Sequence, residues 1–175
     1  SLRGFSSDHS TDIALWIDGV PVNEPVNGPA EGYNDFSEIF TDAVQSIDVI
    51  KGPTNPLFGN FAMGGVVNVH TLDRMQGTQA DASVGSYGSA QATVMTGFDH
   101  GEQGSGVFGV HYEHDDGFRP NAGYDLGQGH ARWVHQLSHG FSLDLGTELY
   151  GTAWNAPGFL SSEEFAQHDY DGVSN

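Results

Sequence analysis

Residues 47–69 read IDVIKGPTNPLFGNFAMGGVVNV, and this stretch decides the architecture of the first part of the chain. Its two short runs rich in apolar residues, 47–50 and 66–69, have the length and the β-branched content of strands. The residues between the runs are rich in glycine, proline and asparagine, which favour turns over regular structure. The pair Gly64-Gly65 directly precedes the second run. The stretch therefore predicts two strands joined by an irregular loop.

The residues upstream of this stretch extend the same unit. Residues 13–22 (IALWIDGVPV) predict a buried strand, a turn at Asp18-Gly19 and a short continuation of the chain in extended form. Asp35 and Glu38 have the spacing of a helix capping box, so we expect a short helix over about residues 36–41. The first part of the chain is therefore predicted to be a small mixed α/β unit with many loops.

The second part of the chain, from about Gln76, alternates apolar and polar residues with period two. Its five alternating segments each predict a strand, and they are residues 81–84, 90–98, 108–113, 132–137 and 141–149. One face of each strand is apolar and the other carries polar residues, although His135 interrupts the apolar face of the fourth. In a soluble sandwich the apolar face would cover a core, whereas in an outer-membrane barrel it would meet lipid. Five strands cannot close a barrel, since the smallest barrels need about eight.

Charge and composition exclude several classes of function. The chain has 23 Asp and Glu against 5 Lys and Arg, which argues against nucleic acid as a partner because phosphate binding needs a basic surface. It has no cysteine, which excludes disulfides and thiolate metal sites. No apolar run approaches the roughly 20 residues of a membrane helix. Because Ser1 begins without Met or a signal peptide, we expect the chain to be part of a longer protein.

No motif supports an enzyme, a cofactor or a metal centre. The glycines at 104, 106 and 109 fit G-x-G-x-x-G, but the segment runs from a turn into a strand, whereas a nucleotide fingerprint opens a helix. Hydrolase, P-loop and zinc-protease motifs are absent from the sequence. His111 and Glu113 would share one face of a strand, while His114 would point to the other, so these residues do not predict a metal site.

Five motifs of the first part occur in a recognisable order. They are Arg3-Gly4-Phe5, residues 16–22 (WIDGVPV), residues 47–53 (IDVIKGP), Leu57-Phe58-Gly59 and residues 64–69 (GGVVNV). In this order and spacing they resemble the plug domain of TonB-dependent outer-membrane receptors. Two departures are minor, because Lys51 stands where many members have Arg, and Phe58 where Tyr is common.

The resemblance implies a β-dominated fold in two domains. Residues 1–72 would be the C-terminal part of a small mixed α/β plug domain. Residues 73–175 would be the start of a 22-stranded transmembrane β-barrel, with only about five of its antiparallel strands present.

The resemblance also implies ligand uptake across the outer membrane of a Gram-negative bacterium. The partners would be TonB, through an N-terminal segment absent from this chain, together with outer-membrane lipid and a small ligand, without nucleic acid or cofactor. Ligands of the family include ferric siderophores, haem, cobalamin, metals and saccharides. The excess of acidic residues favours a neutral or cationic ligand, such as a saccharide, a corrinoid or a metal complex, and a siderophore stays possible. The alternative is a soluble acidic β-rich module that binds calcium or glycans.

Residue roles follow from the same resemblance. Arg3 and Lys51 match plug cations that pair with glutamates of the barrel wall, and those glutamates would lie outside this chain. Asp8 and His9 match one apical plug loop, and Tyr33 and Asn34 match a second, so these four are the candidate ligand contacts. The residues that extend the same polar surface are Asn23, Glu24, Asn27 and Glu31.

The plug cations lead to a first prediction. In the full-length receptor, Arg3 and Lys51 should each lie within salt-bridge distance of a barrel glutamate. Because such a pair is at least partly desolvated, Lys51→Met should destabilise plug seating by up to ~3–5 kcal/mol. The measurement is the urea dependence with which a cysteine placed in the plug becomes accessible to a thiol reagent. A structure of the full receptor with both cations in open water would contradict the assignment.

Overall fold

The computed structural model describes residues 11–26, 28, 31–158 and 160–167. By their contacts the residues divide into two compact units, Ser1–Leu72 and Asp73–Asn175. Among the described residues, no helix is long and apolar enough to cross a membrane.

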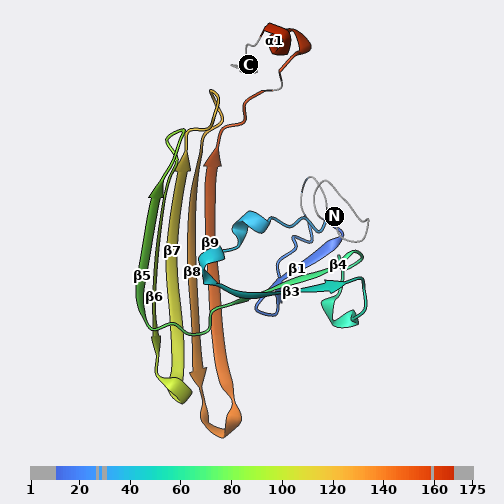
Figure 1. Cartoon of the computed structure of the whole chain (residues 1–175). Coiled ribbons are helices and arrows are strands. Elements are labelled where there is room, and N and C mark those ends of the chain that lie inside the picture. Colours follow the sequence, from blue (N-terminus) through green and yellow to red (C-terminus); the bar gives the residue numbers. More distant parts are fainter. Residues whose placement is uncertain (1–10, 27, 29–30, 159, 168–175) are drawn as a thin grey trace. The chain divides into compact units, whose positions relative to one another are not determined.

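The first unit is built on a four-stranded sheet with the order β2-β1-β4-β3. Its strands are β1 (Ile13–Ile17), β2 (Val20–Pro21), β3 (Val44–Lys51) and β4 (Gly65–Thr71). β1 pairs with β4 in parallel, while β1–β2 and β3–β4 are antiparallel (Figure 1). The strands predicted at residues 13–17, 47–50 and 66–69 are thus confirmed. The two β-branched runs become neighbours because the glycine-rich loop between them allows the chain to reverse.

A small core forms against this sheet. Ala14, Ala62 and Val66 are almost completely buried, and partly buried Trp16 and Phe58 pack against them. The Trp16 and Phe58 rings meet edge to face with their centroids 5.3 Å apart. That geometry is favourable because the positive edge of one ring meets the negative face of the other.

The helix expected over residues 36–41 is present only as two short 3₁₀ turns, η1 (Phe36–Glu38) and η2 (Thr41–Ala43). Asp35 caps the first turn, since its side chain accepts a hydrogen bond from the Ser37 N–H at 2.9 Å. The chain leaves the turn at Ile39, whose backbone is already extended. The sequence signal for a helix start was correct, but a single turn fixes several dihedral angles for few hydrogen bonds and does not extend by itself. A third 3₁₀ turn, η3 (Pro56–Phe58), lies in the β3–β4 loop.

Asp18 joins the β1–β2 turn to the end of β4. Both turn residues have positive φ, 48° at Asp18 and 83° at Gly19, as a tight hairpin turn requires. The Asp18 carboxylate accepts hydrogen bonds from the Thr71 N–H, at 2.9 Å, and from the Thr71 hydroxyl. Thr71 is 2% exposed, so this charge-assisted contact is shielded from water and anchors the last residue of the sheet.

The second unit is an antiparallel meander of five strands in chain order (Figure 1). The strands are β5 (Gly77–Val84), β6 (Ala90–Asp99), β7 (Gly104–Asp115), β8 (Tyr124–Gln136) and β9 (Ser142–Trp154). Two 3₁₀ turns, η4 (Gly101–Gln103) and η5 (Ser138–Gly140), close the short connections at one end, and a helix, α1 (Ser162–Gln167), follows β9. All five predicted strands are confirmed, and each of them extends beyond the alternating segment that predicted it.

Each strand of the meander places its apolar and polar residues on opposite faces. On the apolar face Val94, Val110 and Leu149 lie in one row across the sheet, in register with Gly129. Val110 and Leu149 are 60% and 67% exposed, so no second layer of the described chain covers them. An exposed apolar face of this size is what a barrel wall in lipid requires, and it would be unfavourable in water.

The apolar face ends in aromatic residues beside the short turns. The rings of Phe98 and Phe108 stack with centroids 6.5 Å apart, and those of Trp133 and His135 stack at 5.5 Å. His135, which interrupted the apolar pattern in the sequence, therefore lies at the edge of this face against an indole ring. Amphipathic rings at such an edge match the aromatic girdle of a membrane barrel.

The two faces lead to a second prediction, in which Leu145 and Gly146 carry the same substitution. Leu145→Arg places a charge on the apolar face and should destabilise the folded receptor by about 2–4 kcal/mol in lipid. Gly146→Arg is the matched control on the polar face, since a Cβ at Gly146 meets nothing within 4 Å. Urea unfolding of the full receptor in vesicles measures both. Equal destabilisation by the two substitutions would contradict the assignment of the faces.

Candidate functional site

The candidate site residues fall into two groups. Arg3, Asp8 and His9 lie outside the described residues. Tyr33, Asn34 and Lys51 lie within them, all in the first unit.

Tyr33 ends a loop of residues 24–33, called the 24–33 loop below. The ends of this loop are joined by an isolated bridge, in which the Glu24 N–H donates to the Tyr33 carbonyl at 2.8 Å and the Gly32 N–H donates to the Glu24 carbonyl at 2.8 Å. Tyr33 is half-buried, whereas Val26 and Glu31 are exposed. The loop therefore has a closed base, with Tyr33 half-buried at its end and Glu31 exposed.

Asn34, the second candidate ligand contact of this segment, is buried in the structure. Its side chain is 6% exposed, and its amide donates to the carbonyl of Ile13 on β1 at 2.9 Å. A side chain that is buried and hydrogen-bonded to the sheet supports the loop from within and has little freedom to contact a ligand. The sequence pattern could not distinguish these roles, because a polar residue beside a loop suits both.

The surroundings of Tyr33 are acidic. Burial raises the pKa of Glu38 above its ordinary value, and the nearby carboxylates of Asp35 and Glu24 raise it further. This effect shows that three carboxylates gather beside the base of the 24–33 loop. No Lys or Arg occurs between Arg3 and Lys51 in the sequence to neutralise them. The described residues beside the base of the loop therefore carry several negative charges close together.

Lys51 is exposed at the end of β3, where it lies opposite Gly65 of β4. Within the described residues the Lys51 ammonium makes no ion pair of 4 Å or less. The following Gly52 has a φ of 82°, a left-handed conformation that suits glycine, and its N–H donates to the Gly64 carbonyl at 3.1 Å. The turn therefore presents the lysine at the tip of an edge strand.

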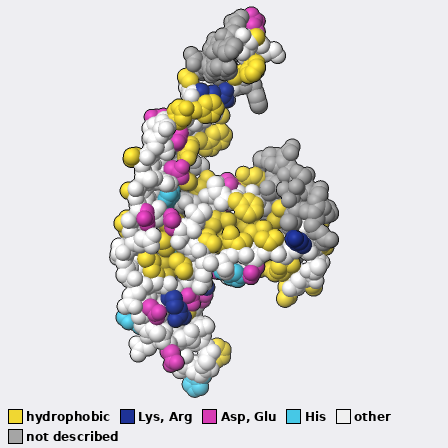
Figure 2. Space-filling view, viewed as in Figure 1, with side chains coloured by type: hydrophobic (Ala, Val, Ile, Leu, Met, Phe, Trp, Pro, Cys, Tyr) yellow, Lys and Arg dark blue, Asp and Glu magenta, His cyan; other side chains and the backbone are white. Residues whose placement is uncertain are grey.

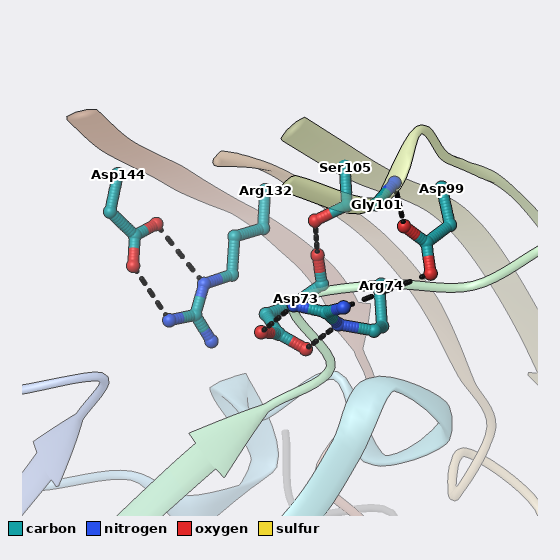
Figure 3. Close-up of polar contacts among 7 residues, drawn as sticks. All are labelled: Asp73, Arg74, Asp99, Gly101, Ser105, Arg132 and Asp144. Atoms are coloured by element: carbon teal, nitrogen blue, oxygen red, sulfur yellow. Dashed lines mark hydrogen bonds and ion pairs between the residues drawn. The ribbon is translucent and has the colours of Figure 1, made fainter. Parts of the chain in front are cut away.

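The second unit contains a polar cluster that the sequence did not reveal (Figure 3). Asp73 accepts a hydrogen bond at its carbonyl from the Ser105 hydroxyl at 2.5 Å, and Arg74 lies 3.4 Å from the Asp73 carboxylate. Arg74 also approaches Asp99 at the end of β6, at 3.8 Å. These contacts hold the segment that leads into β5 against β6 and β7.

Arg132 and Asp144 form a bidentate ion pair on the polar face. The Arg132 Nε and Nη2 atoms donate to the two Asp144 oxygens at 3.1 and 2.7 Å (Figure 3). Arg132 lies on β8 opposite Gly146 of β9, and Asp144 lies two residues earlier on β9, so the pair is diagonal across the two strands. The diagonal arrangement depends on strand register, which explains why sequence spacing did not predict it.

Histidines and acids lie near the C-terminal end of β7 and the N-terminal end of β8. His111 and Glu113 share the polar face, with His111 Nε2 3.6 Å from a Glu113 oxygen. His114 points to the opposite face, as predicted, and its Nδ1 lies 2.9 Å from Asp125. Within the described part of the chain, no group of three or more metal-ligating side chains gathers. Figure 2 shows acidic side chains along this unit and few basic ones on the visible face.

Comparison with known proteins identifies the first part of the chain. The family model described as the TonB-dependent Receptor Plug Domain matches residues 1–66. These residues therefore match the plug domain of TonB-dependent receptors. A vitamin B12 transporter of Vibrio cholerae serotype O1 is 27% identical over 185 residues, covering 99% of this chain and 29% of that protein. The vitamin B12 transporter of Vibrio vulnificus is 28% identical over 179 residues, covering 99% of this chain and 27% of that protein.

Solved receptors share the fold. The ferric citrate transporter FecA superposes with a TM-score of 0.72 at 17% identity, over 94% of this chain and 26% of that protein. The pyoverdine receptor FpvA of Pseudomonas aeruginosa gives a TM-score of 0.65 at 16% identity, over 90% of this chain and 23% of that protein. This chain thus spans less than a third of the length of its relatives. TonB-dependent receptors are proteins of the Gram-negative outer membrane, and that is the location of this chain.

The ion pair on the polar face leads to a third prediction. A double-mutant cycle with Arg132→Gln and Asp144→Asn should show a coupling of about 0.5–1 kcal/mol, because the pair is bidentate and Arg132 is mostly buried. The coupling should weaken at high salt. Arg74→Gln with Asp73→Asn is the control cycle, and it should show a smaller coupling since Arg74 is more exposed and its contacts are longer. Urea unfolding of the full receptor measures both cycles, and a zero coupling for Arg132 and Asp144 would show that the geometry is wrong.

Proposed function

We propose that the chain is part of an outer-membrane receptor that binds a small ligand from outside and admits it with energy supplied by TonB. The plug-domain match over residues 1–66, followed directly by a meander with an exposed apolar face, carries this proposal. The relatives are transporters and receptors, so the chain takes part in transport and not in catalysis. TonB would act through a plug segment that precedes Ser1.

Residues 1–72 are assigned to the plug domain and residues 73–175 to the start of the barrel. The division into compact units at Leu72 supports this boundary. Both edge strands of the meander, β5 and β9, are free to pair with further strands on the side away from their neighbours. Strands outside this chain would use these edges to close the barrel, because unpaired backbone groups are costly in lipid.

The ligand class that best fits the site is neutral or cationic, with a corrinoid first. Two relatives that cover nearly the whole chain are vitamin B12 transporters. The carboxylates of Glu24, Asp35 and Glu38 beside Tyr33 oppose an anionic ferric siderophore, which would need Arg or Lys. The soluble-module alternative is disfavoured, because the apolar face of β5–β9 would then be exposed to water.

The proposed contacts come from two apical segments. Tyr33 meets the ligand from the 24–33 loop, and Asp8 with His9 would meet it from a second loop. Asn34 belongs to the support of Tyr33, given its buried contact with Ile13. Arg3 and Lys51 would fix the plug to the barrel wall, and the exposed position of Lys51 at a strand end suits that role.

Uptake by the full-length receptor provides the fourth prediction. Cells that express it should take up cyanocobalamin in a TonB-dependent manner and should take up a ferric catecholate siderophore poorly. Tyr33→Ala should raise the half-saturating cyanocobalamin concentration by about tenfold, the effect of losing ~1.4 kcal/mol of contact. Tyr87→Ala is the control, since Tyr87 is an exposed tyrosine of the β5–β6 turn. Efficient siderophore uptake that is insensitive to Tyr33→Ala would overturn the ligand class and the contact together.

A further inference from the structure

We propose that Asn23 is a positioning residue for ligand binding, because its side-chain amide sets the geometry of the 24–33 loop and of Tyr33 at its end. This inference rests on the proposed role of Tyr33 as a ligand contact. In the sequence Asn23 was grouped with the polar surface of the loop. In the structure its side chain is buried, with the residue 9% exposed, and faces β1.

The Asn23 side-chain amide makes the hydrogen bonds to β1 that would otherwise come from a longer β2. β2 pairs with β1 only at Trp16 and Ile17, and the Val22 N–H then donates to the Leu15 carbonyl at 3.0 Å. For the next pair of bonds to β1, the Asn23 side chain replaces the main chain. The Leu15 N–H donates to Asn23 Oδ1 at 2.8 Å, and Asn23 Nδ2 donates to the Ile13 carbonyl at 3.0 Å. An amide side chain can replace a peptide group in this way because it offers the same donor and acceptor.

The same amide also holds the far end of the loop. Asn23 Nδ2 donates to the Gly32 carbonyl at 2.9 Å, so its two N–H groups serve β1 and the loop end. Gly32 directly precedes Tyr33, whose carbonyl accepts from the Glu24 N–H. One side chain therefore links the sheet to both ends of the loop. Its removal would leave the Leu15 N–H and the Gly32 carbonyl without this buried partner.

Gly32 is held from a second side by Phe61. The Phe61 backbone has a φ of 67°, which is strained for a bulky residue. Its ring lies so close to Gly32 that a Cβ at Gly32 would be 2.2 Å from Phe61 Cδ1. Gly32 is thus confined between the Asn23 amide and the Phe61 ring. A strained backbone conformation such as that of Phe61 persists where the surrounding structure requires it. Here it places the Phe61 ring against Gly32, the residue next to Tyr33.

The test uses the full-length receptor with a nitroxide label on a cysteine at position 26, since Val26 is 88% exposed and the 175 residues contain no cysteine. The variants are Asn23→Ala, which removes all three bonds, and Asn23→Asp, which keeps only the bond from Leu15. The matched control is Asn55→Ala, because Asn55 Oδ1 accepts from the Leu57 N–H at 3.0 Å in an exposed turn of the same unit.

The two Asn23 variants should sharpen the spectrum of the label and raise the half-saturating cyanocobalamin concentration by about tenfold. Maximal uptake and receptor abundance should stay as in the wild type, and Asn55→Ala should change neither property. If Asn23→Ala fails to reach the membrane, Asn23→Asp still decides, since it retains the ladder bond from Leu15.

Two outcomes would overturn the inference. An unchanged label spectrum in both Asn23 variants would show that Asn23 does not fix the loop, whatever the ligand is. A sharpened spectrum with unchanged half-saturation would show that the contact is structural only. A wild-type receptor that takes up no cyanocobalamin refutes the cobalamin proposal alone, and the label spectrum then still tests the hold of Asn23 on the loop.

Discussion

The main-chain ladder of β5 to β9 is the constraint on which the second unit depends. Lipid offers no hydrogen-bond partners, so each backbone group in the wall must pair with a neighbouring strand. β7 and β8 pair without interruption from Gly104 with His135 to Asp115 with Tyr124. Once this register is set, every side chain is assigned to one face. The apolar row through Val110 and the ion pair of Arg132 with Asp144 are both consequences of that assignment.

In the first unit the sheet is small and irregular, so its main chain alone does not satisfy all backbone hydrogen-bonding groups. Side chains supply the missing partners where the main chain leaves the sheet. The Asp18 carboxylate holds Thr71 at the end of β4, and the Asn23 and Asn34 amides both donate to the Ile13 carbonyl on β1. Such contacts allow long loops to leave a four-stranded sheet without exposing its edge. The described ends of the 24–33 loop are therefore joined to the sheet by several hydrogen bonds.

Negative charge is spread over both units of the chain. The sequence has a net charge of −18 with 5 basic residues. The acids do not lie in one place, since Glu38 is near the 24–33 loop and Asp125 is on β8. Surfaces with this charge distribution attract cations more than anions. The proposal of a neutral or cationic ligand rests on this physical argument.

The sequence by itself determined the positions of the long strands and the two faces of the meander, because these depend on local composition and on period-two alternation. The resemblance to a plug domain came from the order and spacing of its motifs, and the plug-domain model matches residues 1–66. The sequence also located the turn at Asp18-Gly19 and the capping role of Asp35. The tertiary structure decided which polar residues work inside the fold. In the sequence, Asn23 and Asn34 cannot be told from an asparagine in an exposed loop. Only the tertiary structure places them beside β1, where their side chains hydrogen-bond to its backbone. The pairing of Arg132 with Asp144 likewise required strand register, because a spacing along one strand does not specify the neighbour across the sheet.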